Sequence, residues 1–176
     1  MELFKADKTF FNKKSGVLMQ EHNESFTRWF SSKVEEQVVK KTLVPLKLAW
    51  TATDDDIIAA LGGEEKAEVS LAEIWKLLKL QPRAMEKGLL VTEHLVFNKK
   101  YPSLVTNIFY VRDTRRRLRR VNMHGGLYFG EGWAINAGTI GRHRKHPVNW
   151  SGGDGNQVFV RKSTFQKLGN DYHFSK

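Results

Sequence analysis

The chain has 176 residues, of which 40% are hydrophobic, and it contains eleven Phe and five Trp. This composition excludes an intrinsically disordered chain, and a chain of this length can bury a sizeable core. No apolar run reaches the ~18 residues that a membrane-spanning helix needs, and the absence of cysteine excludes disulfides and thiolate metal sites. We therefore expect one compact domain over residues 1–176, located in the cytoplasm and not associated with a membrane.

Charge is distributed unevenly along the chain, whose net charge is +10. Residues 1–98 contain 14 Lys and Arg against 15 Asp and Glu, whereas residues 99–176 contain 15 against 4. The two parts therefore carry −1 and +11. A neutral part joined to a strongly basic part is typical of a surface dedicated to polyanions. The alternative is a solvated basic face that has no partner.

The first half predicts most of the helices. Asn23 is placed to cap a helix from Glu24 to Lys41, because apolar residues recur there at helical spacing. This stripe consists of Phe26, Trp29, Phe30, Val34 and Val38. The stretch from Leu43 to Thr53 is rich in apolar and β-branched residues and predicts a strand.

Two further helices are predicted from their capping residues. Thr53 begins a short helix through Asp54, Asp55 and Asp56, and we interpret these aspartates as first-turn acids that complement the helix dipole rather than as metal ligands. Ser70 and Glu73 form a capping box ahead of a second helix over about residues 71–80.

The segment after the second cap has a partial family likeness. The capped helix that begins at Ser70 is followed by Leu80-Gln81-Pro82-Arg83 and by Gly88-Leu89-Leu90-Val91. This order resembles winged helix-turn-helix domains, where a capped helix, a turn and a recognition helix precede the wing. Only five residues separate Pro82 from Gly88, whereas a recognition helix needs roughly ten at a rise of ~1.5 Å per residue. The chain is therefore assigned to no family.

The second half predicts strands. Residues 89–97 and 103–112 predict a hairpin with a basic tip, and residues 123–141 are glycine-rich, which favours short strands and loops. Residues 157–161 predict a short strand, after which Ser163 caps a last helical turn. The predicted class is α+β, with helices mainly in the N-terminal half and an antiparallel, β-rich, basic C-terminal half. A subdivision into 1–88 and 89–176 is the alternative to a single domain.

The most basic stretch runs from Asp113 to Arg120. It contains five arginines in six residues, interrupted only by Leu118. Arginine side chains are rarely buried without partners, and only four acids follow Lys99, so pairing inside this half cannot satisfy them all. Their planar guanidinium groups bind phosphates through two parallel hydrogen bonds.

The sequence therefore predicts a non-enzymatic protein that binds DNA or RNA through phosphates, without a cofactor or metal. The candidate phosphate-binding residues are Lys99, Lys100, Arg115, Arg116, Arg117, Arg119, Arg120, Arg142, Arg144, Lys145, Arg161 and Lys162. Aromatic side chains stack on unpaired bases, and the candidates for stacking are Tyr101, Tyr128, Trp133 and Trp150.

Two other functions remain open. The basic half is also suited to dock on an acidic protein or a nucleoprotein complex, as an adaptor or inhibitor does. A third hypothesis is a metal-dependent nuclease that uses His124, His143 and His146. No His-Glu-x-x-His pattern is present, and histidines between arginines are typical of a cationic patch.

Overall fold

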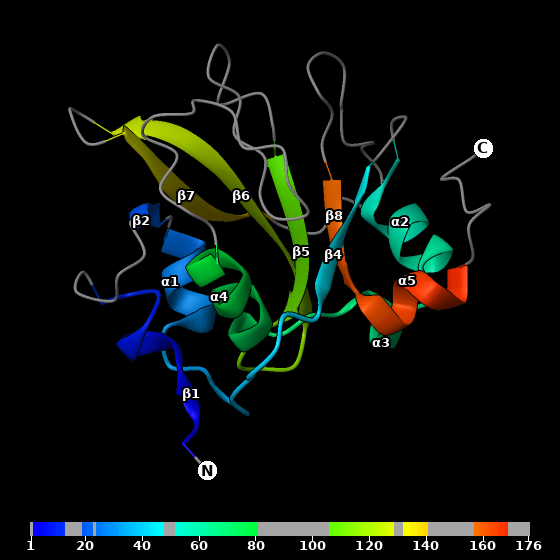
Figure 1. The fold of residues 1–176 in the computed structure, drawn as a ribbon, viewed down its shortest axis with the longest axis horizontal. Coiled ribbons are helices and arrows are strands. Elements are labelled where there is room, and N and C mark those ends of the chain that lie inside the picture. The colour runs from blue at the N-terminus through cyan, green and yellow to red at the C-terminus, as the bar shows by residue number, and fades with distance from the viewer. Residues whose placement is uncertain are drawn as a thin grey trace.

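The computed structural model describes residues 2–12, 19–22, 24–47, 52–80, 106–128, 132–140 and 157–168. Its central feature is a six-stranded mixed sheet in the order β2-β7-β6-β5-β8-β4, with helices on both sides (Figure 1). A separate antiparallel pair is formed by β1 and β3. The class is α+β, with helices mainly toward the N-terminus and strands mainly toward the C-terminus, as predicted.

The strands confirm part of the prediction. Their bounds are β1 Phe4–Lys5, β2 Met19–His22, β3 Val34–Glu35, β4 Leu43–Lys47, β5 Thr106–Arg112, β6 Leu118–Tyr128, β7 Gly132–Ile140 and β8 Gln157–Arg161. The predicted strand over 157–161 is confirmed by β8. In the glycine-rich stretch, residues 123–128 and 132–140 belong to two long antiparallel strands, β6 and β7, instead of short strands, and the other residues of the stretch lie outside the described ones. Strand β5 pairs with β6 in the antiparallel and with β8 in the parallel direction.

The helices follow their caps closely. They are the 3-10 helix η1 Ala6–Lys8 and the α-helices α1 Glu24–Phe30, α2 Asp54–Ala60, α3 Glu64–Ala67, α4 Leu71–Leu80 and α5 Lys162–Leu168. Both predicted caps, Thr53 and Ser70, are present. Thr53 Oγ1 accepts from the N–H of Asp56 at 3.1 Å, and Ser70 Oγ accepts from the N–H of Glu73 at 3.1 Å. Helix α5 begins one residue before its predicted cap.

The helix predicted over 24–41 is wrong beyond Phe30. The following residues are drawn into contacts that a continuous helix would break. Val34 pairs with Lys5 in the β1–β3 ladder. The carboxylate of Glu35 accepts from the first two N–H groups of α4, at 3.2 and 2.8 Å. Tertiary pairing therefore overrides the apolar periodicity, and the chain continues without helix to β4.

The central strands are buried on both faces, which creates two cores. Alternate residues of β5 point to opposite sides, so that Phe109 and Val111 meet α1 and α4 while Ile108 and Tyr110 meet α2 and α3. Figure 1 shows α1 and α4 to one side of β5, with α2 and α5 to the other. The sheet is therefore the middle layer between two groups of helices.

Both halves of the sequence contribute to this sheet. Strands β2 and β4 precede residue 98, yet they form the two outer strands beside β7 and β8. The proposed boundary between residues 88 and 89 lies outside the described residues, as do the predicted strand at 89–97, its basic tip and the end of the segment that resembles a winged helix. Within the described ranges, no helix has the length and apolarity needed to cross a bilayer.

Candidate nucleic-acid interface

The first three arginines of the run lie in the turn that connects β5 to β6. The N–H of Asp113 donates to the carbonyl of Arg117 at 2.9 Å, and the N–H of Arg116 donates to the carbonyl of Asp113 at 3.0 Å. These bonds close residues 113–117 into a tight turn. The side chains of Arg115, Arg116 and Arg117 are all exposed, so the turn presents three consecutive guanidinium groups to solvent.

The carboxylate of Asp113 organises this turn from within. One oxygen accepts from the N–H groups of Arg115 and Arg117 at 2.8 and 2.9 Å, and the other accepts from Nε of Arg119 at 3.0 Å. Burial alone would raise the pKa of Asp113, but these hydrogen bonds outweigh it and hold the pKa below its ordinary value. The acid therefore stays ionised and acts as a structural ligand of the turn.

The three exposed arginines differ from their neighbours in their charge partners. Arg112 at the end of β5 is paired with Glu68 at 2.8 Å and with Glu64 at 3.6 Å. Within the part of the chain that the structure describes, no carboxylate forms an ion pair with any of the three exposed turn arginines. The turn therefore carries three positive charges that no described acid neutralises by contact.

Arg116 occupies a backbone conformation that favours glycine, because its φ is 62°. We predict that Arg116→Gly raises the free energy of unfolding by about 0.5–1 kcal/mol, since relief of the left-handed penalty exceeds the extra entropy of glycine in the unfolded chain. Chemical denaturation measures this. The same variant is expected to bind nucleic acid about eightfold more weakly at 0.1 M salt if Arg116 contacts one phosphate. A lower free energy of unfolding in Arg116→Gly than in the wild type would contradict a strained backbone at Arg116.

Arg119 is held by the protein itself. Its guanidinium lies 3.8 Å from the ring centroid of Trp29 and is paired with Asp113 at 3.0 Å. An arginine stacked on an indole and bonded to a buried carboxylate has little freedom to reach a separate ligand. We therefore assign to Arg119 the role of fixing the turn against α1.

Arg120 lies in the core, although the sequence places it among the phosphate-binding candidates. Its side chain is 2% exposed, and Nη1 lies 3.5 Å from Oδ1 of Asp54 at the start of α2. The hydroxyl of Tyr110 donates to the same oxygen at 2.7 Å. Burial lowers the pKa of Arg120, while the charge of Asp54 opposes that shift. We leave Arg120 out of the interface because no phosphate reaches it in this arrangement.

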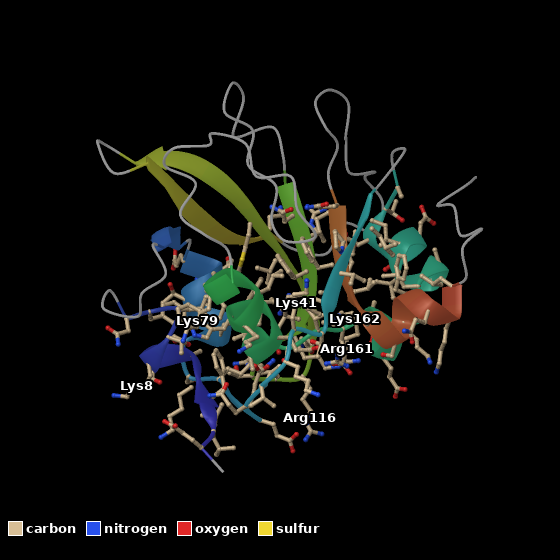
Figure 2. The ribbon with its side chains drawn as sticks, in the orientation of Figure 1. Lys8, Lys41, Lys79, Arg116, Arg161 and Lys162 are labelled. Carbon is tan, nitrogen blue, oxygen red and sulfur yellow. The ribbon has the colours of Figure 1, made fainter. Side chains whose placement is uncertain are left out.

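Arg161 and Lys162 lie at the same end of the central strands as the turn. We call this end of the sheet, with Arg115, Arg116, Arg117 and Lys162, the basic edge. Strands β5 and β8 run parallel with Ile108 opposite Val158, so that both strands end at one edge. Figure 2 shows Arg161 and Lys162 near the middle of the view and Arg116 below them. Lys162 is exposed, and it therefore extends the basic edge beyond the turn.

Arg161 is committed to an internal ion pair. Its Nε and Nη2 donate to one oxygen of Glu73 at 2.8 and 2.7 Å, and the hydroxyl of Thr42 donates to the other. Burial would raise the pKa of Glu73, but the hydrogen bonds from Arg161 and Thr42 outweigh it and lower the pKa. Of the two candidates on β8 and α5, Lys162 is thus the one with an exposed charge.

The other candidates lie outside the described residues. These are Lys99, Lys100, Tyr101, Arg142, Arg144, Lys145 and Trp150, together with His143 and His146. The backbones of His124, Tyr128 and Trp133 belong to β6 and β7, but their side chains are not among those described. Within the described ranges, no group of three His, Asp or Glu side chains is placed to hold a metal ion.

Sequence reasoning missed two parts of this site. The role of Asp113 had a local signal, because aspartate at the start of a turn often accepts hydrogen bonds from N–H groups two residues on. Lys40 and Lys41 had none, since they were assigned to the end of a helix. In the structure they line the same cavity as Arg161 and Lys162.

Comparison of the chain with protein-family models, with curated proteins and with solved structures found no match in any of the three. The fold and the site define an α+β protein with an arginine-rich turn and further cations along one edge of a mixed sheet. The function must therefore be inferred from this edge.

Proposed function

We propose that the protein binds DNA or RNA through the phosphate backbone. Among the residues that the structure describes, Arg115, Arg116 and Arg117 are the main phosphate contacts in this proposal. The observation that supports this proposal best is the turn itself, which presents three exposed guanidinium groups from a fixed backbone. Guanidinium groups bind phosphates through two parallel hydrogen bonds. A turn that is already closed by hydrogen bonds also loses little conformational entropy on binding.

The chemistry favours a nucleic acid over an acidic protein. Residues 99–176 carry a net charge of +11, which suits a ligand with one charge on every nucleotide. The three arginines that we propose as contacts lie on a short turn and not on a long helix that enters a groove. This position favours contacts with phosphates over the reading of base edges. We therefore expect little sequence preference. An adaptor or inhibitor that docks on an acidic protein remains the second candidate.

The test is a fluorescence-anisotropy titration with single-stranded DNA, duplex DNA and RNA at several salt concentrations, with and without Mg²⁺. If six to eight cations contact phosphates, log affinity falls against log salt with a slope of about −5 to −7 on duplex DNA. Absence of binding to all three ligands at about 50 mM salt would overturn the proposal and favour a protein partner. Cleavage of the ligand only in Mg²⁺ would favour the nuclease that uses the histidines.

A further inference from the structure

A cavity of ≈ 660 Å³ lies beside the basic edge. It is open to solvent and is lined by the segment between β3 and β4, by the start of α4 and by the junction of β8 with α5. Its volume is in the range of pockets that bind small organic molecules, which is about 300–1,000 Å³. The cavity is therefore much larger than a bare phosphate ion requires.

Two of the acids that line this cavity are already neutralised by the protein. Glu35 accepts from the N–H groups of Leu71 and Ala72, and it is paired with Lys33 at 3.0 Å. Glu73 is 5% exposed and is paired with Arg161 at 2.7 Å. These carboxylates complete the wall of the cavity and the cap of α4, and they leave little negative charge for a ligand to meet.

The remaining charged groups make the cavity positive. Lys40, Lys41 and Lys162 line it together with one further acid, Glu36. The ammonium groups of Lys40 and Lys162 alone outnumber this carboxylate, so the lining is positive without counting Lys41, which has a contact of its own. Lys40 and Lys162 are exposed, so their ammonium groups are able to turn toward a ligand. A phosphomonoester carries a charge of about −1.5 to −2 at pH 7, which is opposite in sign to the lining.

Hydroxyl groups add directional contacts to the charge. Ser70 Oγ accepts from the N–H of Glu73 at 3.1 Å, and its own proton is left to donate because a hydroxyl both donates and accepts. Ser163 also lines the cavity. Phosphate oxygens accept such hydrogen bonds, whereas a cationic ligand would be repelled by the lysines.

We propose that this cavity binds a phosphomonoester of mononucleotide size, namely the 5′-phosphorylated end of a bound strand. This inference rests on the proposed function, because the strand is the one whose backbone the arginine turn holds. The turn and the cavity lie at the same edge, since the parallel strands β5 and β8 end there. A free nucleotide offers the same chemistry, and the experiment separates these two sources.

Binding is first measured by anisotropy with an oligothymidylate of about eight nucleotides, labelled at its 3′ end, in 5′-phosphorylated and 5′-hydroxyl forms. We expect the phosphorylated form to bind at least about tenfold more tightly at 0.1 M salt, because two lysine contacts each contribute roughly fivefold. Calorimetry with AMP and with adenosine tests the cavity without a strand. AMP is expected to bind, and adenosine is not.

The variant Lys40→Ala/Lys162→Ala should abolish both the preference for the phosphorylated end and the binding of AMP. The matched control, Lys8→Ala/Lys79→Ala, removes two exposed lysines from other elements and should keep both. Equal affinity for the two oligonucleotides would overturn the strand-end proposal and leave the proposed function intact. Binding of AMP without binding of any oligonucleotide would instead overturn the proposed function, and with it the strand as the source. Failure of both ligands would overturn both proposals.

Discussion

Replacing Arg115, Arg116 and Arg117 together with alanine is expected to weaken nucleic-acid binding by two to three orders of magnitude. Each phosphate contact contributes about 0.9 to the salt slope on duplex DNA, so the loss of three contacts lowers log affinity by about 2.7 at 0.1 M salt. The fold should be unaffected, because the three side chains are exposed and the turn is held by main-chain groups and Asp113. Anisotropy titrations at several salt concentrations measure both the affinity and the slope.

A charge-matched control distinguishes contact from net charge. Lys8, Lys79 and Lys167 are exposed residues of three other elements, and Figure 2 shows Lys8 and Lys79 away from Arg116. Their replacement with alanine removes the same three charges, but screening beyond ~10 Å at 0.1 M salt should leave most of the affinity. Equal losses in the two triple variants would mean that binding depends only on total charge. Unchanged affinity in the arginine variant would remove the turn from the interface.

The position of the arginine run is predictable from the sequence. Its division into exposed arginines and arginines with internal partners is not. The sequence places the run next to a predicted strand, and β5 and the turn agree with that. The strand β6, however, begins at Leu118. From there alternate side chains point to opposite faces, so Arg119 meets Trp29 while Arg120 meets Asp54. Trp29 and Asp54 both belong to the nearly neutral half, more than 60 residues before the arginines that they contact.

The helices show the same distinction between local and distant causes. The caps at Thr53 and Ser70 are correct because each is formed by residues three positions apart. The helix over 24–41 is wrong because what ends it is distant, namely the pairing of Val34 with Lys5 and the hydrogen bond that Glu35 accepts from an N–H group of α4. The same distant pairing places the segment between β3 and β4 in the wall of the cavity. The cavity is therefore not predictable from the local sequence.

Replacing Arg120 with methionine is expected to lower the free energy of unfolding by about 3–5 kcal/mol, because it removes the cation that faces the buried charge of Asp54. Asp54 is 0% exposed and receives a hydrogen bond from Tyr110, but a neutral hydroxyl does not replace the lost cation. Urea denaturation followed by circular dichroism measures the change. Where the variant remains folded, its affinity for nucleic acid should equal that of the wild type.

The double variant Arg120→Met/Asp54→Asn tests the cause of this loss. Asparagine keeps an oxygen that accepts from Tyr110 and removes the charge that Arg120 faces in the wild type, so the double variant should recover most of the stability. A double variant no more stable than Arg120→Met would contradict the ion pair as the cause, and a loss below about 1 kcal/mol in the single variant would contradict the buried position itself. The effects of Arg120→Met on affinity and stability should be the opposite of those of the triple alanine variant of the turn. We expect the exposed arginines to affect binding and Arg120, three residues after the turn, to affect stability.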